Sequence, residues 1–384
     1  MPSPSRPIVH SDPFDLSVDG RAVKTPIAIA SMAGTVDAAY VAERAGHVGM
    51  AFIGGYSVDP PTIAASRQMA EGGRCEFLPG DPVAELTRQA DLLSALPVVG
   101  GVNLRASSPE ALVAIAQAVG DRVIYEIDAH CRQAPMTAAG AGEYLLHHTD
   151  RLAEMVRALA SEGVTVSVKV RAGMAENDPR LARQLWEAGA TLFHIDLMDG
   201  GYAKIRQIRN ASPIMIIANN SMQSFDRVME MFSHGADLVS LARRSDPETL
   251  AGIDAAITRY AKEFGWYNAP KQLCRGGDVR ALTFCCLPVK DCPLLPTLQK
   301  IGLSREEYVK LKRESVQGTP IQDGAYTCFG SLAWCCKVSS PCLLRDATLD
   351  QMKISKKQYM EEKRRLSRAI MARVFPPRDN DDSG

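Results

Sequence analysis

The chain has 384 residues, of which 46% are hydrophobic and 23% charged, a composition typical of a globular protein with one large core or two ordinary ones. It contains no run of about 18 apolar residues and no apolar signal core at its start, so we expect a cytoplasmic protein rather than a secreted or membrane-spanning one. Its formal charge is zero, but residues from Ala261 onward carry 21 Lys+Arg against 14 Asp+Glu, which leaves 23 against 30 before them; a basic second half suits a nucleic-acid or acidic partner, or simply a solvated face.

In chain order, short apolar and β-branched runs alternate with longer amphipathic stretches. Strands are predicted over eight segments: 26–31, 49–54, 98–103, 122–128, 164–170, 190–196, 213–219 and 237–242. Helices are predicted between and after them: 83–96, 108–119, 150–162, 178–188, 224–233 and 247–264. Near-continuous hydrophobic strands alternating with helices indicate a parallel sheet covered on both faces.

Eight such units fit one closed (β/α)8 barrel, a TIM barrel. An open doubly wound sheet is the alternative, but the first strand is followed by Met32-Ala33-Gly34-Thr35 and not by Gly-x-Gly-x-x-Gly. We predict an N-terminal extension over 1–22, the barrel over 23–262, a cysteine-rich domain over 263–374 and a disordered acidic tail over 375–384.

Polar side chains close or follow nearly every predicted strand. In a barrel of this kind these positions meet at one end, where catalysis occurs. The sequence therefore predicts a site built from Ser31, Asn103, Asp128, His130, Cys131, Lys169, Arg171, Asp196, Asn219, Asn220, Arg243 and Arg244.

The second half contains an internal repeat. Its two copies share a cysteine pattern and, after it, a Ser-x-x-Glu or Ser-x-x-Gln pattern that begins at Ser304 and at Ser355. The latter is typical of a capping box, so each copy should consist of a cysteine-bearing loop followed by a helix. The cysteines of the first copy are Cys274, Cys285, Cys286 and Cys292, and those of the second are Cys328, Cys335, Cys336 and Cys342.

Four thiols a copy suffice for one tetrahedral zinc ion or one iron–sulfur cluster, and the spacing leaves both open. Ten cysteines without an export signal argue against a disulfide framework. A small module with a thin core would also draw part of its folding free energy from bound metal. We therefore predict a metal-binding tail domain, with ligands held within each copy or shared between the copies.

The barrel segment resembles the dihydrouridine synthases, which are flavin enzymes with a barrel of this type. The resemblance rests on short stretches in family order: 26–35, 126–131, 140–142, 168–173, 218–220 and 241–243. It implies bound FMN, with Met32 and Ala33 near the isoalloxazine ring and Asn103, in the place of a family glutamine, hydrogen-bonded to it. Lys169 would face the end of the ring that becomes negative on reduction.

The same resemblance implies that Asn219, Asn220, Ala242 and Arg243 hold the FMN phosphate. Cys131 occupies the position of the family's proton donor, although a buried free cysteine is the alternative.

The pattern also departs from the family. Asp128 replaces an asparagine, His130 and Arg132 replace the residues beside the cysteine, and Asp196 stands where a characteristic histidine is expected. Two such acids would repel an anionic substrate and raise each other's pKa, so the substrate need not be uracil in tRNA.

The tail segment from Arg275 to Pro293 resembles the cysteine-rich domain of the methanogenesis marker 9 proteins, metalloproteins of methanogenic archaea. The first functional hypothesis is therefore an FMN-dependent oxidoreductase of a small molecule or cofactor precursor, coupled to iron–sulfur clusters and linked to methanogen metabolism. The second is a tRNA-dihydrouridine synthase whose basic tail binds RNA and is stabilised by zinc. The third is a non-catalytic metal-delivery protein.

Overall fold

The computed structural model describes residues 14, 16–19, 21–198, 201–212, 214–264, 266, 298–299, 302–335 and 342–374. It divides into two compact units, Met1–Thr258 and Arg259–Gly384. The predicted boundary between barrel and tail, at residues 262 and 263, lies a few residues beyond this division.

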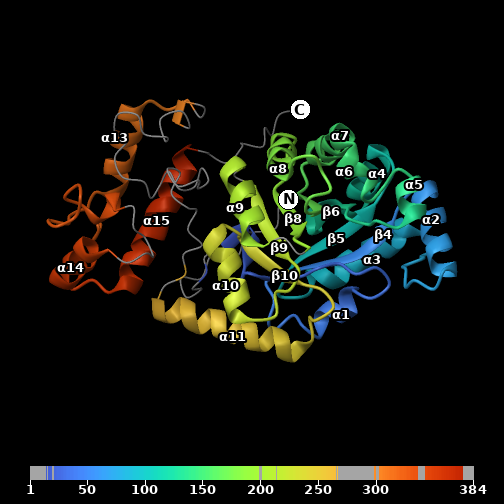
Figure 1. Ribbon diagram of the computed structural model, residues 1–384, viewed down its shortest axis with the longest axis horizontal. Helices are drawn as coiled ribbons and strands as arrows, with labels where there is room; N and C mark the ends of the chain where they lie inside the picture. The colour runs from blue at the N-terminus through green and yellow to red at the C-terminus, as the bar shows by residue number, and fades with distance from the viewer. Residues whose placement is uncertain are drawn as a thin grey trace. The chain divides into compact units, whose positions relative to one another are not determined.

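Eight parallel strands form a closed barrel in the first unit (Figure 1). This confirms the predicted (β/α)8 fold and excludes the open doubly wound sheet. Around the barrel, β10 closes onto β3, so each strand pairs with two neighbours. The strands are β3 Ile27–Ile29, β4 Met50–Ser57, β5 Val99–Arg105, β6 Ile124–Ala129, β7 Val166–Arg171, β8 Leu192–Asp196, β9 Met215–Asn219 and β10 Leu238–Leu241.

Helices follow the strands and surround the barrel (Figure 1). Several begin where a side chain accepts a hydrogen bond from the first turn, as Ser108 does for α4 and Ser224 for α10. The helices of this unit are α1 Ala38–Ala42, α2 Pro60–Glu71, α3 Pro82–Ser94, α4 Pro109–Val119, α5 Ala134–Ala138, α6 Tyr144–His147, α7 Thr149–Ser161, α8 Asp178–Glu187, α9 Tyr202–Ala211 and α10 Phe225–His234, with a 3-10 turn η1 at Gly120–Arg122. Helix α11, Pro247–Phe264, begins in this unit and continues past its last residue, Thr258.

An antiparallel hairpin precedes the barrel strands. It consists of β1 Leu16–Val18 and β2 Arg21–Val23. Val18 and Val23 belong to one buried apolar cluster with Met50, Phe52 and other residues from the beginnings of barrel strands. The predicted extension over 1–22 therefore contributes to the barrel core through Val18, which together with Val23 covers apolar residues at the amino-terminal end of the strands.

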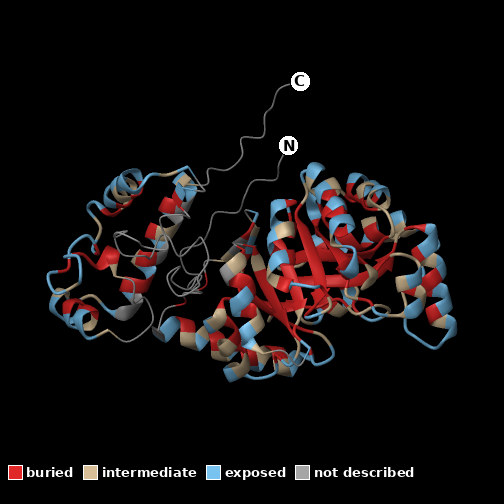
Figure 2. Ribbon diagram, turned by 45° about the horizontal axis from the view of Figure 1, so that its top comes forward, coloured by how far each residue is buried: buried red, intermediate tan, exposed pale blue. Residues whose placement is uncertain are grey.

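The interior of the barrel is polar toward the carboxyl ends of the strands. Side chains alternate along a strand, so residues two apart share a face. Glu126 and Asp128 of β6 pair in register with Ser167 and Lys169 of β7, and these residues are buried. Figure 2 shows that burial is concentrated in the strands. The apolar cluster at one end and this polar set at the other place the site at the carboxyl end.

The second unit has its own core. Its described elements are α13 Arg305–Val316, η4 Leu332–Trp334, α14 Leu343–Met352 and α15 Lys356–Val374. Both predicted capping boxes are confirmed: Ser304 and Glu307 exchange side-chain and backbone hydrogen bonds, as do Ser355 and Gln358.

The repeat is also visible in this core. Tyr308 and Lys312 of the first copy match Tyr359 and Lys363 of the second, and all four are buried. The Lys363 ammonium donates to the carbonyls of Ala333, at 2.8 Å, and Cys335, at 3.1 Å. The second-copy helix α15 thus binds the loop that bears its cysteines.

Among the described residues, no helix combines the length and the hydropathy that crossing a bilayer requires.

Candidate functional site

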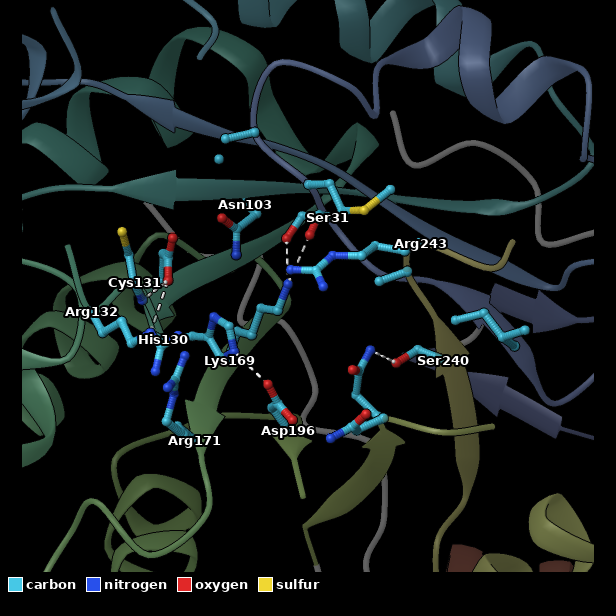
Figure 3. Close-up of a pocket in the computed structure, with 18 of the residues that line it drawn as sticks. Ser31, Asn103, His130, Cys131, Arg132, Lys169, Arg171, Asp196, Ser240 and Arg243 are labelled. Carbon is cyan, nitrogen blue, oxygen red and sulfur yellow. Dashed lines mark hydrogen bonds and ion pairs between the residues drawn. The ribbon is translucent and has the colours of Figure 1, made fainter. Parts of the chain in front are cut away.

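A cavity of about 710 Å³ opens at the carboxyl end of the barrel strands (Figure 3), a volume within the range of about 300 to 1,000 Å³ usual for ligand sites. All nine site residues predicted in the barrel line it: Met32, Ala33, Asn103, Cys131, Lys169, Asn219, Asn220, Ala242 and Arg243. The structure therefore brings together residues from six strand ends, those of β3, β5, β6, β7, β9 and β10.

Asp128 organises the loop that carries Cys131. Its Oδ1 accepts hydrogen bonds from the backbone amides of His130, at 2.9 Å, and Cys131, at 3.0 Å. Its Oδ2 accepts from Nε of Arg105 at 3.1 Å, and Arg105 pairs in turn with Glu76 at 2.5 Å. Burial opposes ionisation of Asp128, but Arg105, His130 and Lys169 together outweigh it and hold the pKa of this carboxyl below its usual range.

The thiol of Cys131 is buried at the cavity wall, with 7% of the residue exposed. Burial raises its pKa, and the negative charge of Asp128 raises it further, against the opposing charge of Arg105. The thiol is therefore protonated at neutral pH. This is the state that a proton donor requires, whereas a cysteine nucleophile or metal ligand needs the thiolate.

His130 and Asp196 form a second polar pair in the cavity, with Nε2 of the histidine 2.7 Å from Oδ2 of the carboxylate (Figure 3). Burial would raise the pKa of Asp196, but hydrogen bonds from His130 and the Met198 amide lower it to about 2. Asp128 and Asp196 thus both have lowered pKa values. The expectation that these acids raise each other's pKa is wrong, because each has its own cationic or donor partner.

The positive charges are distributed unevenly over the cavity lining. Seven cationic side chains, Arg74, Arg105, Arg132, Lys169, Arg171, Arg243 and Arg244, line it together with two carboxylates, Asp128 and Asp196. Arg74 and Arg105 pair with Glu76, and Arg171 lies 3.4 Å from Glu143. In the described part of the chain no carboxylate pairs with Arg132, Lys169, Arg243 or Arg244. The uncompensated charge therefore lies mainly at β7 and β10.

Lys169 is held against the end of β3. Its ammonium donates to the backbone carbonyl of Ser31, at 3.0 Å, and to its hydroxyl, at 2.8 Å. Figure 3 shows Arg243 extending toward the same serine. A buried ammonium and a guanidinium beside one strand end form a suitable site for an anionic group of a ligand.

The loops after β9 and β10 supply the remaining predicted residues. Nδ2 of Asn219 donates to Oγ of Ser240 at 2.7 Å, and Nδ2 of Asn220 donates to the carbonyl of Met198 at 2.8 Å. Asn220 and Ser221 adopt left-handed backbone conformations, with φ of 89° and 61°, so the chain turns sharply at the cavity. In many barrels the last two strand-end loops bind a phosphate.

Two buried residues beneath the cavity were not predicted as site residues from the sequence. Glu126 and His194 are completely buried inside the barrel, with Nδ1 of His194 2.7 Å from Oε2 of Glu126. A signal existed: each lies two positions before a predicted site residue on the same strand, Asp128 or Asp196, and so points inward too. Glu76 was also missed, and it lies in no strand that would have indicated its direction.

The predicted metal ligands are described only in part. Cys274, Cys285, Cys286, Cys292 and Cys336 lie outside the described residues. Of the others, Cys328 is exposed, and Cys335 and Cys342 are half-buried. The described segments contain no cluster of three or more His, Cys, Asp or Glu side chains suited to a metal.

The chain is similar to one described protein family and to several known proteins. A family model described as dihydrouridine synthase (Dus) matches residues 90–269. Among solved structures, a FabK mutant from Thermotoga maritima aligns with a TM-score of 0.39 and 18% identity over 58% of this chain and 63% of its own. An Amycolatopsis orientalis BexX/CysO complex aligns with a TM-score of 0.41 and 18% identity over 66% of this chain and 98% of the other.

Two relatives come from Methanocaldococcus jannaschii. The uncharacterized protein MJ0144 is 26% identical over 234 residues, which cover 56% of this chain and 88% of the relative. The uncharacterized protein MJ0115 is 47% identical over 107 residues, which cover 28% of this chain and 69% of the relative. The chain therefore carries a dihydrouridine synthase domain and belongs to the same family as MJ0115.

Proposed function

We propose that this protein is an FMN-dependent oxidoreductase that reduces a double bond of a small molecule at the carboxyl end of the barrel. The observation that carries the proposal is one cavity lined both by a buried cation, Lys169, and by a protonated thiol, Cys131. The dihydrouridine synthase match supports a flavin reductase.

The cavity residues fit FMN. When bound, FMN would supply the hydride. Its phosphate needs cations and donors, and Arg243 and Arg244 line the cavity after β10 without a carboxylate partner among the described residues. Lys169 offers a positive charge to the ring. Gly55 leaves room for the side chain of Asn103 at the cavity lining, since a Cβ at position 55 would lie 2.7 Å from Oδ1 of Asn103. Met32 and Ala33 add lining beside Ser31.

In this proposal Cys131 donates a proton to the reduced double bond of the substrate. The raised pKa keeps the proton on sulfur until the substrate carbon develops negative charge. Asp128 fixes the loop by accepting from the amides of His130 and Cys131. Arg105 and Glu76 hold Asp128 in turn, so the position of the thiol depends on a buried ion-pair network.

We propose further that the tail cysteines hold iron–sulfur clusters, from which electrons reach the flavin site. If the tail holds zinc instead, that metal is structural, because zinc carries no electrons. The duplicated pattern of eight cysteines supports a metal-binding tail. The Methanocaldococcus relatives are consistent with a link to methanogen metabolism.

A second candidate is reduction of uridine in tRNA, which the dihydrouridine synthase match favours. Arg74 and Arg132 are exposed at the cavity lining and could contact phosphates. Binding to bulk tRNA that weakens steeply between 50 and 200 mM salt would support this candidate, because phosphate contacts release counterions.

Anaerobic purification tests the proposal directly. Flavin, iron, zinc and acid-labile sulfide are measured on the same sample. We expect one FMN per chain, together with iron and acid-labile sulfide. The Cys131→Ser variant should retain FMN, whereas Lys169→Ala should lose most of it. Protein that repeatedly lacks flavin, and does not take up added FMN, would refute the flavin assignment. Stoichiometric zinc without sulfide would replace the clusters with a structural metal.

A further inference from the structure

A continuous row of hydrogen bonds crosses the barrel interior beneath the cavity. Nδ2 of Asn103 donates to Oε1 of Glu126 at 2.9 Å, and Nδ1 of His194 lies 2.7 Å from Oε2 of the same carboxylate. On the other side of the ring, Nε2 of His194 lies 2.8 Å from Oγ of Ser240, which accepts from Nδ2 of Asn219 at 2.7 Å. All five residues are buried, and its two ends line the cavity.

The direction of every hydrogen bond in this row follows from one charge. An ionised carboxylate only accepts, so Asn103 must turn its NH2 group, and His194 its Nδ1–H, toward Glu126. A neutral histidine protonated at Nδ1 accepts at Nε2, so the Ser240 hydroxyl donates to it. Ser240 then has only lone pairs left for the NH2 group of Asn219.

The protonation states required for this direction agree with the surroundings. Burial opposes ionisation of Glu126, but His194, Lys169 and Asn103 outweigh it and lower the pKa of the carboxyl. Burial also lowers the pKa of His194, although Glu126 pulls the other way. A carboxylate beside a neutral imidazole is the result.

We propose that Glu126 and His194 are positioning residues: they fix the polarity of the row, so that Asn103 and Asn219 both present carbonyl oxygens to hydrogen-bond donors of a bound flavin nucleotide. The inference rests on the proposed function. Asn219 would then accept a hydrogen bond from a donor of the ligand, such as a ribityl hydroxyl. The phosphate would be bound by Arg243 and Arg244.

The geometry supports acceptors at both ends. Oδ1 of Asn103 lies next to Gly55 at the cavity lining, since a Cβ on Gly55 would approach it to 2.7 Å. Oδ1 of Asn219 accepts no hydrogen bond from the described part of the chain. Ring N–H and ribityl O–H groups are the donors that FMN offers, and both would meet these oxygens.

The Glu126→Gln variant tests the inference because it keeps the shape and replaces one acceptor by a donor. Whichever way the new amide lies, one end of the row must reverse. If its NH2 group faces His194, the histidine changes to the Nε2–H tautomer, Ser240 donates to Asn219 and that amide turns. If the new NH2 group faces Asn103 instead, the side-chain amide of Asn103 turns and that of Asn219 does not.

Two readouts are measured. Proton–nitrogen correlation spectra of histidine-labelled apoprotein give the tautomer of His194, whose signals are identified by their loss in His194→Asn. Fluorescence titration gives the FMN dissociation constant, which we expect to rise about tenfold in Glu126→Gln, because a ligand donor then meets a protein donor. Ser167→Ala is the matched control: it removes another donor to Oε2 of Glu126, at 2.9 Å, without reversing the row.

The outcomes separate the two proposals. Wild-type His194 should be the neutral Nδ1–H tautomer; the Nε2–H tautomer would overturn the inference even in protein without flavin. Wild-type protein that binds no FMN would overturn the proposed function. Wild-type protein that binds FMN, with Glu126→Gln unchanged in both tautomer and affinity, would overturn the inference alone. If Glu126→Gln does not fold, Ser240→Ala should retain the tautomer but weaken FMN binding, because Asn219 loses its orienting partner.

Discussion

The substitution Asp128→Asn tests how the thiol of Cys131 is positioned and protonated. The carbonyl of asparagine can still accept from the amides of His130 and Cys131. Its NH2 group, however, would face the Nε–H donor of Arg105, now 3.1 Å from a carboxylate oxygen. Losing this charge-assisted hydrogen bond should cost about 1.5–3 kcal/mol. For a unit of this size that lowers the Tm by about 3–12 °C, measured by circular dichroism.

The same variant should lower the pKa of Cys131, because the charge of Asp128 is one cause of its elevation. The alkylation rate of the peptide that contains Cys131, followed by mass spectrometry between about pH 7 and pH 10, should then rise at lower pH than in the wild type. Arg105→Met is the matched control: it should raise the pKa of the Cys131 thiol, because the Arg105 guanidinium lowers that pKa. Identical profiles in all three proteins would refute the electrostatic account.

Three further changes test separate parts of the structure. Lys169→Met should keep the fold but weaken FMN binding by at least about tenfold, in fluorescence titration, because the buried cation at Ser31 is lost. Arg209→Met should lower the free energy of unfolding in urea by about 3–5 kcal/mol, because it removes the buried ion pair between Arg209 and Asp237, whereas Arg183→Met at an exposed pair should cost less than about 1 kcal/mol. The pKa of Asp196 is lowered from 3.8 to about 2, so the stability from this carboxylate is complete above about pH 4 and is lost as the pH falls toward 2; the Tm difference between wild type and Asp196→Asn should vanish over that range.

The sequence predicted the barrel strands well because parallel strands buried on both faces leave near-continuous apolar runs. It ended two of them early. The predicted segment 49–54 continues as β4 to Ser57, and 98–103 continues as β5 to Arg105. Gly54 and Gly55 lie inside β4, where Gly55 marks a close approach of the backbone to Asn103. Within a strand, a glycine can therefore signal proximity rather than a break.

The sequence also placed the site residues at one end of the barrel, because strand order alone brings those ends together. It could not predict which side chains pair. His130 and Asp196 are 66 positions apart and Arg105 and Glu76 are 29 apart, and each contact depends on barrel closure and on side-chain rotamers. The expectation that Asp128 and Asp196 raise each other's pKa failed for this reason: the partners that lower each pKa include residues of other strands and loops.

The charges of the cavity now separate into two groups with different consequences. Around Cys131, each carboxylate has a partner, namely Arg105 for Asp128 and His130 for Asp196. These pairs fix the positions of the two carboxylates beside the thiol. At the β7 and β10 ends, Lys169 and Arg243 have no carboxylate partner in the described part of the chain. Because uncompensated cations repel one another in a partly buried site, the pattern favours a ligand that brings its anion to β10 and a neutral reacting group to Cys131. Under the proposed function, that asymmetry assigns the β10 end of the cavity to the cofactor phosphate and the Cys131 end to the substrate.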